Sequence, residues 1–73
     1  MPQEIVEVPI TGKITAVKVT VGSTVKEGDV VCILESMKMQ NPILSPVGGR
    51  VKEIKVAPGQ TVKSGEVIAV IEY

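Results

Sequence analysis

The sequence lacks histidine, tryptophan and phenylalanine, and it has one cysteine, Cys32, and one tyrosine, Tyr73. Histidine is the commonest general base and metal ligand in proteins, so its absence argues against acid–base catalysis and metal binding. One cysteine can form neither an internal disulfide nor a cysteine-based metal site. We therefore expect no catalytic machinery and no metal site in this chain.

A charge excess of either sign is also absent, because eight basic residues balance eight acidic ones. Without a basic face or aromatic rings that could stack on bases, nucleic-acid binding is not expected. No apolar run approaches the roughly 18 residues of a membrane-spanning helix, and the N-terminus has no basic-then-apolar signal segment. The expectation is a cytoplasmic protein that does not insert into a membrane.

The composition indicates one small folded domain, residues 1–73. Apolar residues make up 44% of the chain, which is well above the range of disordered proteins. A chain of this length buries only about 60% of the surface that its unfolded form exposes. It therefore has little room for a deep catalytic cleft.

The chain contains an internal repeat. Moved forward by 37 positions, residues 9–35 align with residues 46–72 without a gap. The 27 aligned pairs include 11 identities, which are Pro9/Pro46, Gly12/Gly49, Lys18/Lys55, Val19/Val56, Gly22/Gly59, Thr24/Thr61, Val25/Val62, Lys26/Lys63, Gly28/Gly65, Val30/Val67 and Glu35/Glu72. Two similar halves predict a molecule with quasi-twofold symmetry. The symmetry mate of the joint between the halves is the gap between the chain ends, so Lys38, in the joint, should project from the opposite end of the domain.

Hydrophobic patterning indicates strands and no helix. Valines alternate with polar residues over residues 17–21, which predicts a half-buried strand, and residues 51–56 hold the matching place. Residues 30–34 and 67–71 are continuous apolar runs rich in β-branched side chains, typical of strands buried on both faces. The side chains expected in the core, themselves or through their immediate neighbours, are Val31, Ile33, Ile68 and Val70.

Shorter strands are expected at residues 5–8 and 43–44, and turns rich in glycine and proline separate the apolar segments. This pattern predicts an all-β domain of about seven or eight short strands, arranged as a small sandwich or flattened barrel. The joint, residues 35–40, contains neither glycine nor proline, so ordinary residues must form its turn. Pro42 lacks a ladder donor, which predicts an edge position for the strand that follows.

The joint also carries a motif. Glu35-Ser36-Met37-Lys38-Met39, followed by residues 42–46, resembles the biotin attachment site of biotinyl domains. These are the carboxyl carrier domains of biotin-dependent carboxylases, decarboxylases and transcarboxylases. The resemblance extends from about Ile5 to Glu72 and includes the glycine-containing turns of both halves.

The resemblance implies a flattened barrel-sandwich of two four-stranded antiparallel sheets with a quasi-twofold internal repeat. It implies that a biotin protein ligase joins biotin to the Lys38 amine, and that the biotin carries CO2 between partner active sites. Those sites would belong to biotin carboxylase and to carboxyltransferase or decarboxylase subunits. Because no insertion lies between Gly12 and Gly22, the chain resembles the carriers that lack a protruding thumb.

Each residue of the motif also has a plainer interpretation. Lys38 could be an ordinary surface lysine, although its position in the joint favours attachment. Met37 and Met39 could pack one hairpin face against the domain, or the ligase could read them. Ser36 stands where alanine is common, and Glu35 could be a recognition residue or a strand-end charge that Glu72 repeats.

The chemistry expected of the Lys38 amine and the Cys32 thiol follows from their surroundings in the sequence. An exposed lysine amine is mostly protonated near neutral pH, so its activation for acylation must come from the modifying enzyme. Cys32 lies in an apolar run and is expected to be a buried, inert thiol.

Two alternatives to a biotin carrier remain: a lipoyl or dual biotin/lipoyl attachment protein, and an unmodified lipoyl-like assembly module.

Overall fold

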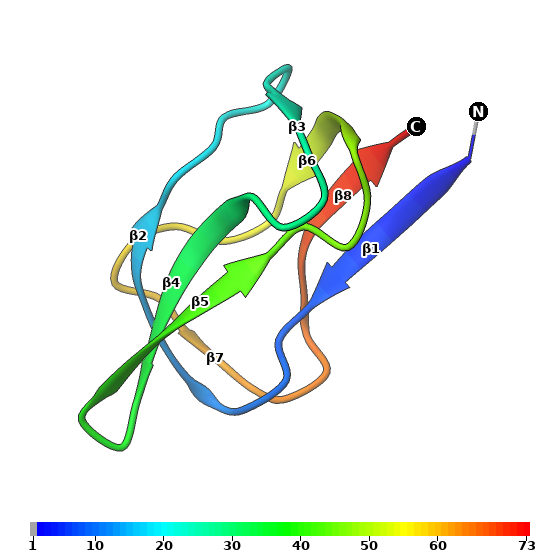
Figure 1. The fold of residues 1–73 in the computed structure, drawn as a ribbon. Coiled ribbons are helices and arrows are strands. Elements are labelled where there is room, and N and C mark those ends of the chain that lie inside the picture. Colours follow the sequence, from blue (N-terminus) through cyan, green and yellow to red (C-terminus); the bar gives the residue numbers. More distant parts are fainter. Residues whose placement is uncertain (1) are drawn as a thin grey trace.

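The computed structural model describes residues 2–73, which form eight strands. The strands are β1 (Gln3–Glu7), β2 (Gly12–Val17), β3 (Thr24–Val25), β4 (Val30–Ser36), β5 (Met39–Leu44), β6 (Gly49–Ile54), β7 (Thr61–Val62) and β8 (Val67–Glu72). They build two four-stranded antiparallel sheets with the orders β1-β8-β6-β3 and β5-β4-β2-β7 (Figure 1). Within residues 2–73, no helix is present that is long and apolar enough to cross a membrane.

The two sheets repeat each other strand for strand. The shift of 37 residues turns β1, β8, β6 and β3 into counterparts of β5, β4, β2 and β7, in the same order. The irregularities repeat as well, because the β2–β4 register shifts between Ile14 and Ala16 and the β6–β8 register shifts between Val51 and Glu53. The predicted fold, two four-stranded antiparallel sheets with a quasi-twofold internal repeat, is therefore confirmed.

Backbone hydrogen bonds outside the strands follow the same symmetry. The Gly22 amide donates to the Val51 carbonyl at 2.8 Å, and the Gly59 amide donates to the Ile14 carbonyl at 2.6 Å. These bonds connect the loop after each long strand to the other half of the molecule. Each half thus completes the backbone pairing of the other half, which makes the two halves one folding unit.

Glycine is required at positions 12 and 49, because the backbone of a neighbouring strand passes too close for a side chain. A Cβ atom at Gly12 would lie 2.5 Å from the Glu35 carbonyl oxygen, and one at Gly49 would collide with the Glu72 carbonyl oxygen. Such contacts force the backbone to move, so a larger residue at either position would separate a pair of neighbouring strands.

The core lies between the sheets and consists of aliphatic side chains from both halves. Of the predicted core residues, Val31, Ile68 and Val70 are buried, whereas Ile33 is only partly buried. Its neighbours Cys32 and Leu34 are buried instead. The irregularity between Val30 and Cys32 in the β4–β5 register accounts for this, because a bulge interrupts the strict alternation of inward and outward side chains.

The predicted strand over residues 17–21 is wrong in its extent. β2 ends at Val17, and Val21 is 64% exposed. The ladder with β4 ends at the Val17–Cys32 pair, after which the chain leaves the sheet and turns back toward β3. The two-residue strands β3 and β7 were not predicted. The edge position of the strand that contains Pro42 is confirmed, because β5 is the outermost strand of its sheet.

Candidate functional site

The hairpin formed by β4 and β5 carries all five candidate residues of the motif. Its last paired residues are Ser36 and Met39, so Met37 and Lys38 form a two-residue loop. Both loop residues have positive φ angles, 52° for Met37 and 66° for Lys38. Two-residue hairpin loops with positive φ at both positions match the right-handed twist of the flanking strands, and they normally contain Asn-Gly or Asp-Gly.

Met37 and Lys38 are thus in a conformation that their side chains disfavour. A left-handed backbone costs a residue other than glycine roughly 1–2 kcal/mol. Residues held in such conformations are often found at functional sites, where a requirement for particular side chains outweighs local preference. The sequence of this turn is therefore explained better by function than by hairpin formation.

The tip of the hairpin lies at one end of an elongated molecule. The longest dimension is 36 Å, and the other two are 18 and 17 Å. Figure 1 shows the turn between β4 and β5 at one extreme, and the C-terminus and the start of β1 toward the other. The expectation that Lys38 projects from the end opposite the termini is confirmed.

The Lys38 side chain is exposed. The one ion pair among residues 2–73 joins Lys55 to Glu53 at 3.2 Å, so no described carboxylate lies within 4.0 Å of the Lys38 amine. An acyl group attached to this amine would break no ion pair and would leave no buried donor unsatisfied. The geometry of Lys38 therefore fits a covalently attached prosthetic group.

Met37 and Met39 do not pack against the domain. Met37 is 92% exposed and Met39 is 66% exposed. The interpretation that both serve only to fill gaps in the hairpin is therefore wrong. The expectation that they flank the lysine on one face is also wrong, because Met37 shares the loop with Lys38 and Met39 begins β5 opposite Ser36. Both methionines are therefore exposed apolar side chains that flank Lys38 in sequence.

Glu35 occupies equivalent places in both halves of the molecule. It lies opposite Lys13 on one side and Gln40 on the other, just as Glu72 lies opposite Arg50 and Gln3. The shared position favours a role in the ladder over a role specific to the hairpin tip.

Ser36 connects the hairpin to the rest of the domain. Its Oγ donates a hydrogen bond to the Thr11 carbonyl oxygen at 3.0 Å. The Thr11 hydroxyl accepts one from the Ser64 amide at 3.1 Å, and the Ser64 hydroxyl donates to the Pro9 carbonyl oxygen at 3.3 Å. These three bonds, which we call the hairpin brace, fix the base of the hairpin against two loops.

Thr11 and Ser64 were not predicted as site residues. A signal for them was present in the repeat, since the equivalents of Thr11, Ser36 and Ser64 are Gly48, Tyr73 and Glu27. None of these three can make the same bonds, because glycine has no side chain and tyrosine and glutamate differ in length and chemistry. The brace therefore exists at the Lys38 end and has no counterpart at the opposite end.

Cys32 is far from this chemistry. Its side chain is 1% exposed, and burial raises the pKa of its thiol from 9.0 to about 11. A thiol that stays protonated is a poor nucleophile, which agrees with the predicted inert role.

Comparisons with known proteins agree with this geometry. A family model described as "Biotin-requiring enzyme" matches residues 3–71. The chain is 52% identical over 40 residues to the methylmalonyl-CoA decarboxylase subunit gamma of Veillonella parvula, covering 55% of this chain and 31% of that protein. It is 54% identical over 39 residues to the glutaconyl-CoA decarboxylase subunit gamma of Acidaminococcus fermentans, covering 53% and 27%. The chain thus spans less than a third of the length of these relatives.

Two solved structures share the fold. The urea carboxylase of Kluyveromyces lactis superposes with a TM-score of 0.92 at 30% identity, covering 99% of this chain and 6% of that one. A single-chain, multi-domain long-chain acyl-CoA carboxylase superposes with a TM-score of 0.88 at 28% identity, covering 93% and 7%. Together with the match over residues 3–71, these likenesses show that the chain belongs to the family of biotin-carrier domains of biotin-requiring enzymes.

Proposed function

We propose that Lys38 carries covalently attached biotin, and that residues 1–73 act as a single carrier domain without catalysis of their own. The observation that carries the proposal is the exposed amine of Lys38 in a two-residue turn at the end of the long axis. When attached, biotin supplies a ring that accepts and releases a carboxyl group. The chain's own residues supply the position from which that ring reaches its partners.

Attachment would form an amide between the Lys38 Nζ and the carboxyl carbon of biotin. Lys38 would supply the amine, which loses its ammonium proton before it reacts and a second proton as the amide forms, while the ligase would supply the activated carboxyl group and take its leaving group. Because one of eight positive charges disappears while eight negative charges remain, the formal charge of the domain changes from 0 to −1. The turn keeps its shape, since the flanking ladder and the hairpin brace hold it and Lys38 makes no ion pair with a described residue.

We propose two classes of partner. The first is a biotin protein ligase, which would contact Met37 and Met39 beside the lysine and could also contact Glu35 and Ser36. The second consists of the biotin carboxylase and the carboxyltransferase or decarboxylase subunits of one enzyme complex. The names of the two gamma subunits support a decarboxylase among the possible complexes.

The relatives named above require biotin or are carboxylases and decarboxylases, which favours biotin over the lipoyl alternative. An unmodified assembly module would leave the strained turn and its exposed lysine without a purpose.

The test is the intact mass of the protein after expression in biotin-sufficient cells, with a streptavidin blot. We expect the mass of one attached biotin on the native chain and none on Lys38→Arg, which keeps the charge and bulk. Lys18→Arg is the matched control and should be biotinylated normally. The free energy of unfolding of Lys38→Arg should stay within about 0.5 kcal/mol of the native value. Biotin on the Lys38→Arg protein would disprove the assignment.

A further inference from the structure

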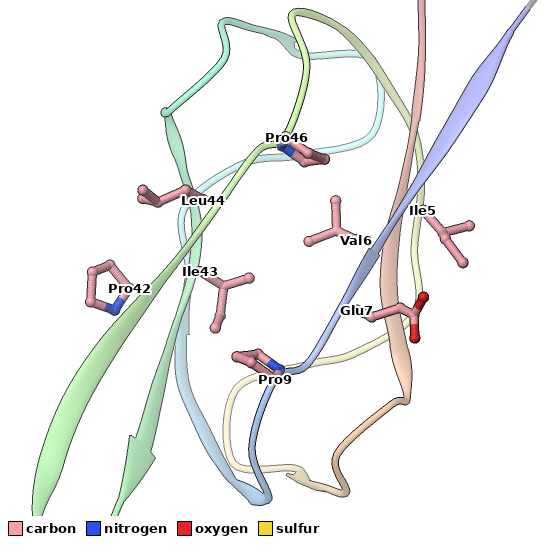
Figure 2. Close-up of a pocket in the computed structure, with 8 residues that line it drawn as sticks. All are labelled: Ile5, Val6, Glu7, Pro9, Pro42, Ile43, Leu44 and Pro46. Carbon is pink, nitrogen blue, oxygen red and sulfur yellow. The ribbon is translucent and has the colours of Figure 1, made fainter.

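One long side of the sandwich is open between β1 and β5. These strands are the outermost members of different sheets, and no Cα atom of β1 lies within 8 Å of a Cα atom of β5. Hydrogen-bonded strands lie about 4.8 Å apart, so β1 and β5 do not pair. A cavity of about 300 Å³ lies between them (Figure 2), at the lower end of the size range of ligand pockets.

The lining of this groove is largely apolar and obeys the quasi-twofold symmetry. Its residues fall into four equivalent pairs, Ile5/Pro42, Val6/Ile43, Glu7/Leu44 and Pro9/Pro46. Figure 2 shows Val6 and Ile43 facing each other between the strands, with Pro9 and Pro46 at the two ends. Ile5 and Leu44 on the rims are 45% and 48% exposed. Such exposed apolar side chains beside a groove are typical of an interaction surface.

The backbone of β1 also faces this groove. At one end of β1 the Tyr73 amide donates to the Pro2 carbonyl at 3.0 Å, and at the other the Val8 amide donates to the Glu66 carbonyl at 3.0 Å. The β1–β8 register shifts between Val6 and Glu7, but Pro2 and Val8, on either side of the shift, both bond toward β8. Alternate residues of an antiparallel strand bond to the same neighbour, so the even-numbered residues of β1 bond toward β8. The N–H and C=O groups of Ile5 and Glu7 therefore point into the open side.

The equivalent edge of β5 is blocked. The Ser45 amide, equivalent to that of Val8, donates to the Asp29 carbonyl at 2.8 Å, so the even-numbered residues of β5 face the groove. Pro42 is one of them, and proline has no N–H to offer. The position equivalent to Pro42 in the first half is Ile5. The β5 edge thus carries a proline that prevents strand addition at this position, whereas the β1 edge carries Ile5 there.

We propose that β1 is a docking edge to which an extended segment of a partner protein adds as a further strand. Main-chain hydrogen bonds to Ile5 and Glu7 would supply affinity, and an apolar side chain of the segment would enter the groove. Glu7 is exposed on the rim, and it takes no part in the one ion pair among residues 2–73. Opposite charges on facing strand positions attract, so the segment carries a lysine or arginine opposite Glu7.

A second copy of the chain fits this groove less well. A stable protein interface buries about 800 Å² on each partner, which is far more than these eight lining residues offer. A single extended segment that adds to β1 needs far less contact area than a second folded domain.

Docking at this edge leaves the hairpin tip free. On the β5 side the groove is lined by Pro42, Ile43, Leu44 and Pro46, whereas the turn with Lys38 lies beyond the other end of β5. A partner bound to β1 would therefore hold the domain without covering the amine (Figure 1). This inference is independent of which group Lys38 carries.

The experiment is an NMR titration of isotope-labelled protein with a capped hexapeptide that alternates lysine and valine. We expect shifts at the Ile5 and Glu7 amides and at the Val6 and Ile43 methyl groups. A hexapeptide that alternates glutamate and valine should bind at least about tenfold more weakly, a difference of 1.4 kcal/mol. Equal binding of the two peptides, or shifts confined to other surfaces, would overturn the proposal.

Ile5→Pro is the decisive variant. It places at position 5 the proline that β5 has at the equivalent position 42, and it removes one N–H that faces the groove. It should weaken binding of the basic peptide about tenfold while the rate of Lys38 biotinylation stays unchanged. Unchanged peptide binding by the folded Ile5→Pro protein would contradict strand addition.

Two further variants test the proposal independently of Ile5→Pro. If Ile5→Pro does not fold, Glu7→Gln should remove the preference for the basic peptide, and a retained preference would refute the charge match. Lys38→Arg should bind the peptide normally, which separates this proposal from biotin attachment. A concentration-dependent dimer that Glu7→Gln strengthens would identify a second copy as the occupant and overturn the partner segment.

Discussion

Ser36 donates a hydrogen bond from its Oγ to the Thr11 carbonyl oxygen at 3.0 Å, one residue before the turn that carries Lys38. The equivalent pair at the other end of the molecule, Tyr73 and Gly48, has no serine hydroxyl and makes no such bond among the described residues. The bond is therefore present at the Lys38 end and is not part of the repeated frame.

Ser36→Ala should release the base of the hairpin. Loss of one exposed hydrogen bond is expected to lower the free energy of unfolding by about 0.5–1 kcal/mol. Amide hydrogen exchange at Met37 to Met39 should accelerate, since local opening of the hairpin becomes easier. The measurement is urea denaturation combined with exchange by NMR. Ser23→Ala is the matched control, because it removes an exposed serine hydroxyl that bonds to Thr20 and lies outside the hairpin brace; equal acceleration in both variants would show that the Ser36 bond does not hold the hairpin.

The turn should be more stable with the residues that its geometry prefers. Met37→Asn combined with Lys38→Gly places Asn-Gly at two positions with φ of 52° and 66°. We expect the free energy of unfolding to rise by roughly 1 kcal/mol, because the left-handed conformation no longer strains two side chains. Thermal and urea unfolding measure the change. A less stable double variant would show that the native turn is not strained.

The exposed methionines should matter for modification more than for folding. Met37→Asp with Met39→Ala removes apolar surface beside the amine while burying nothing new, since these side chains are 92% and 66% exposed. We expect kcat/KM for biotinylation to fall by at least about tenfold, because methionine contributes strongly to protein interfaces. The urea midpoint should not move. An undiminished initial rate of biotinylation in the folded double variant would show that the ligase does not read the methionines.

Coexpression of the same double variant with a lipoate ligase tests whether Met37 and Met39 also prevent attachment of lipoate. Biotin and lipoate attach through the same amine, so the residues beside Lys38 must supply the discrimination. Intact mass after coexpression with each ligase separates the outcomes. Attached lipoate would show that the methionines also exclude the wrong ligase.

Stability at high pH should depend on Cys32. Burial raises the pKa of this thiol to about 11 in the folded protein, from 9.0. The folded state therefore holds the proton more tightly than the unfolded state, so its contribution is complete below pH 9 and is lost as the pH rises through 11. The loss is on the order of 1–3 kcal/mol.

Cys32→Ala is the matched control, because Ala69 holds the equivalent place in the second half. Urea denaturation of both proteins at several pH values above 8 gives the comparison. The native chain should lose stability more steeply than Cys32→Ala, whereas parallel pH dependences would contradict the shift.

The fold was largely predictable because its main signals are periodic. The repeat fixed the quasi-twofold symmetry and the location of Lys38, and Pro42 predicted an edge strand. The end of β2 was not predictable from alternation alone. Val17, Val19 and Val21 alternate as a strand would, but the ladder ends at Val17 and the following valines lie in a loop.

The position of the hairpin was predictable from the sequence, whereas its shape was not. Alternation around a single tip residue suggested that Met37 and Met39 share a face, whereas a loop of two residues places Met37 beside Lys38. Loop length depends on the pairing register, which the sequence does not state. The hairpin brace was missed for a similar reason, since Thr11, Ser36 and Ser64 are distant in sequence and only the fold brings them together.

From the Cys32–Ile43 pair onward, the ladder of β4 and β5 is continuous to the Ser36–Met39 pair, so paired backbone connects the core directly to the turn with Lys38. The orientational freedom of an attached group therefore resides in side-chain torsions, while the domain moves as a rigid body. Attachment to a rigid hairpin confines the group to a small volume at a fixed distance from any surface that binds the domain. Capture of the domain by a partner would convert the meeting of biotin and active site into an intramolecular event, with a high effective concentration and a low entropic cost.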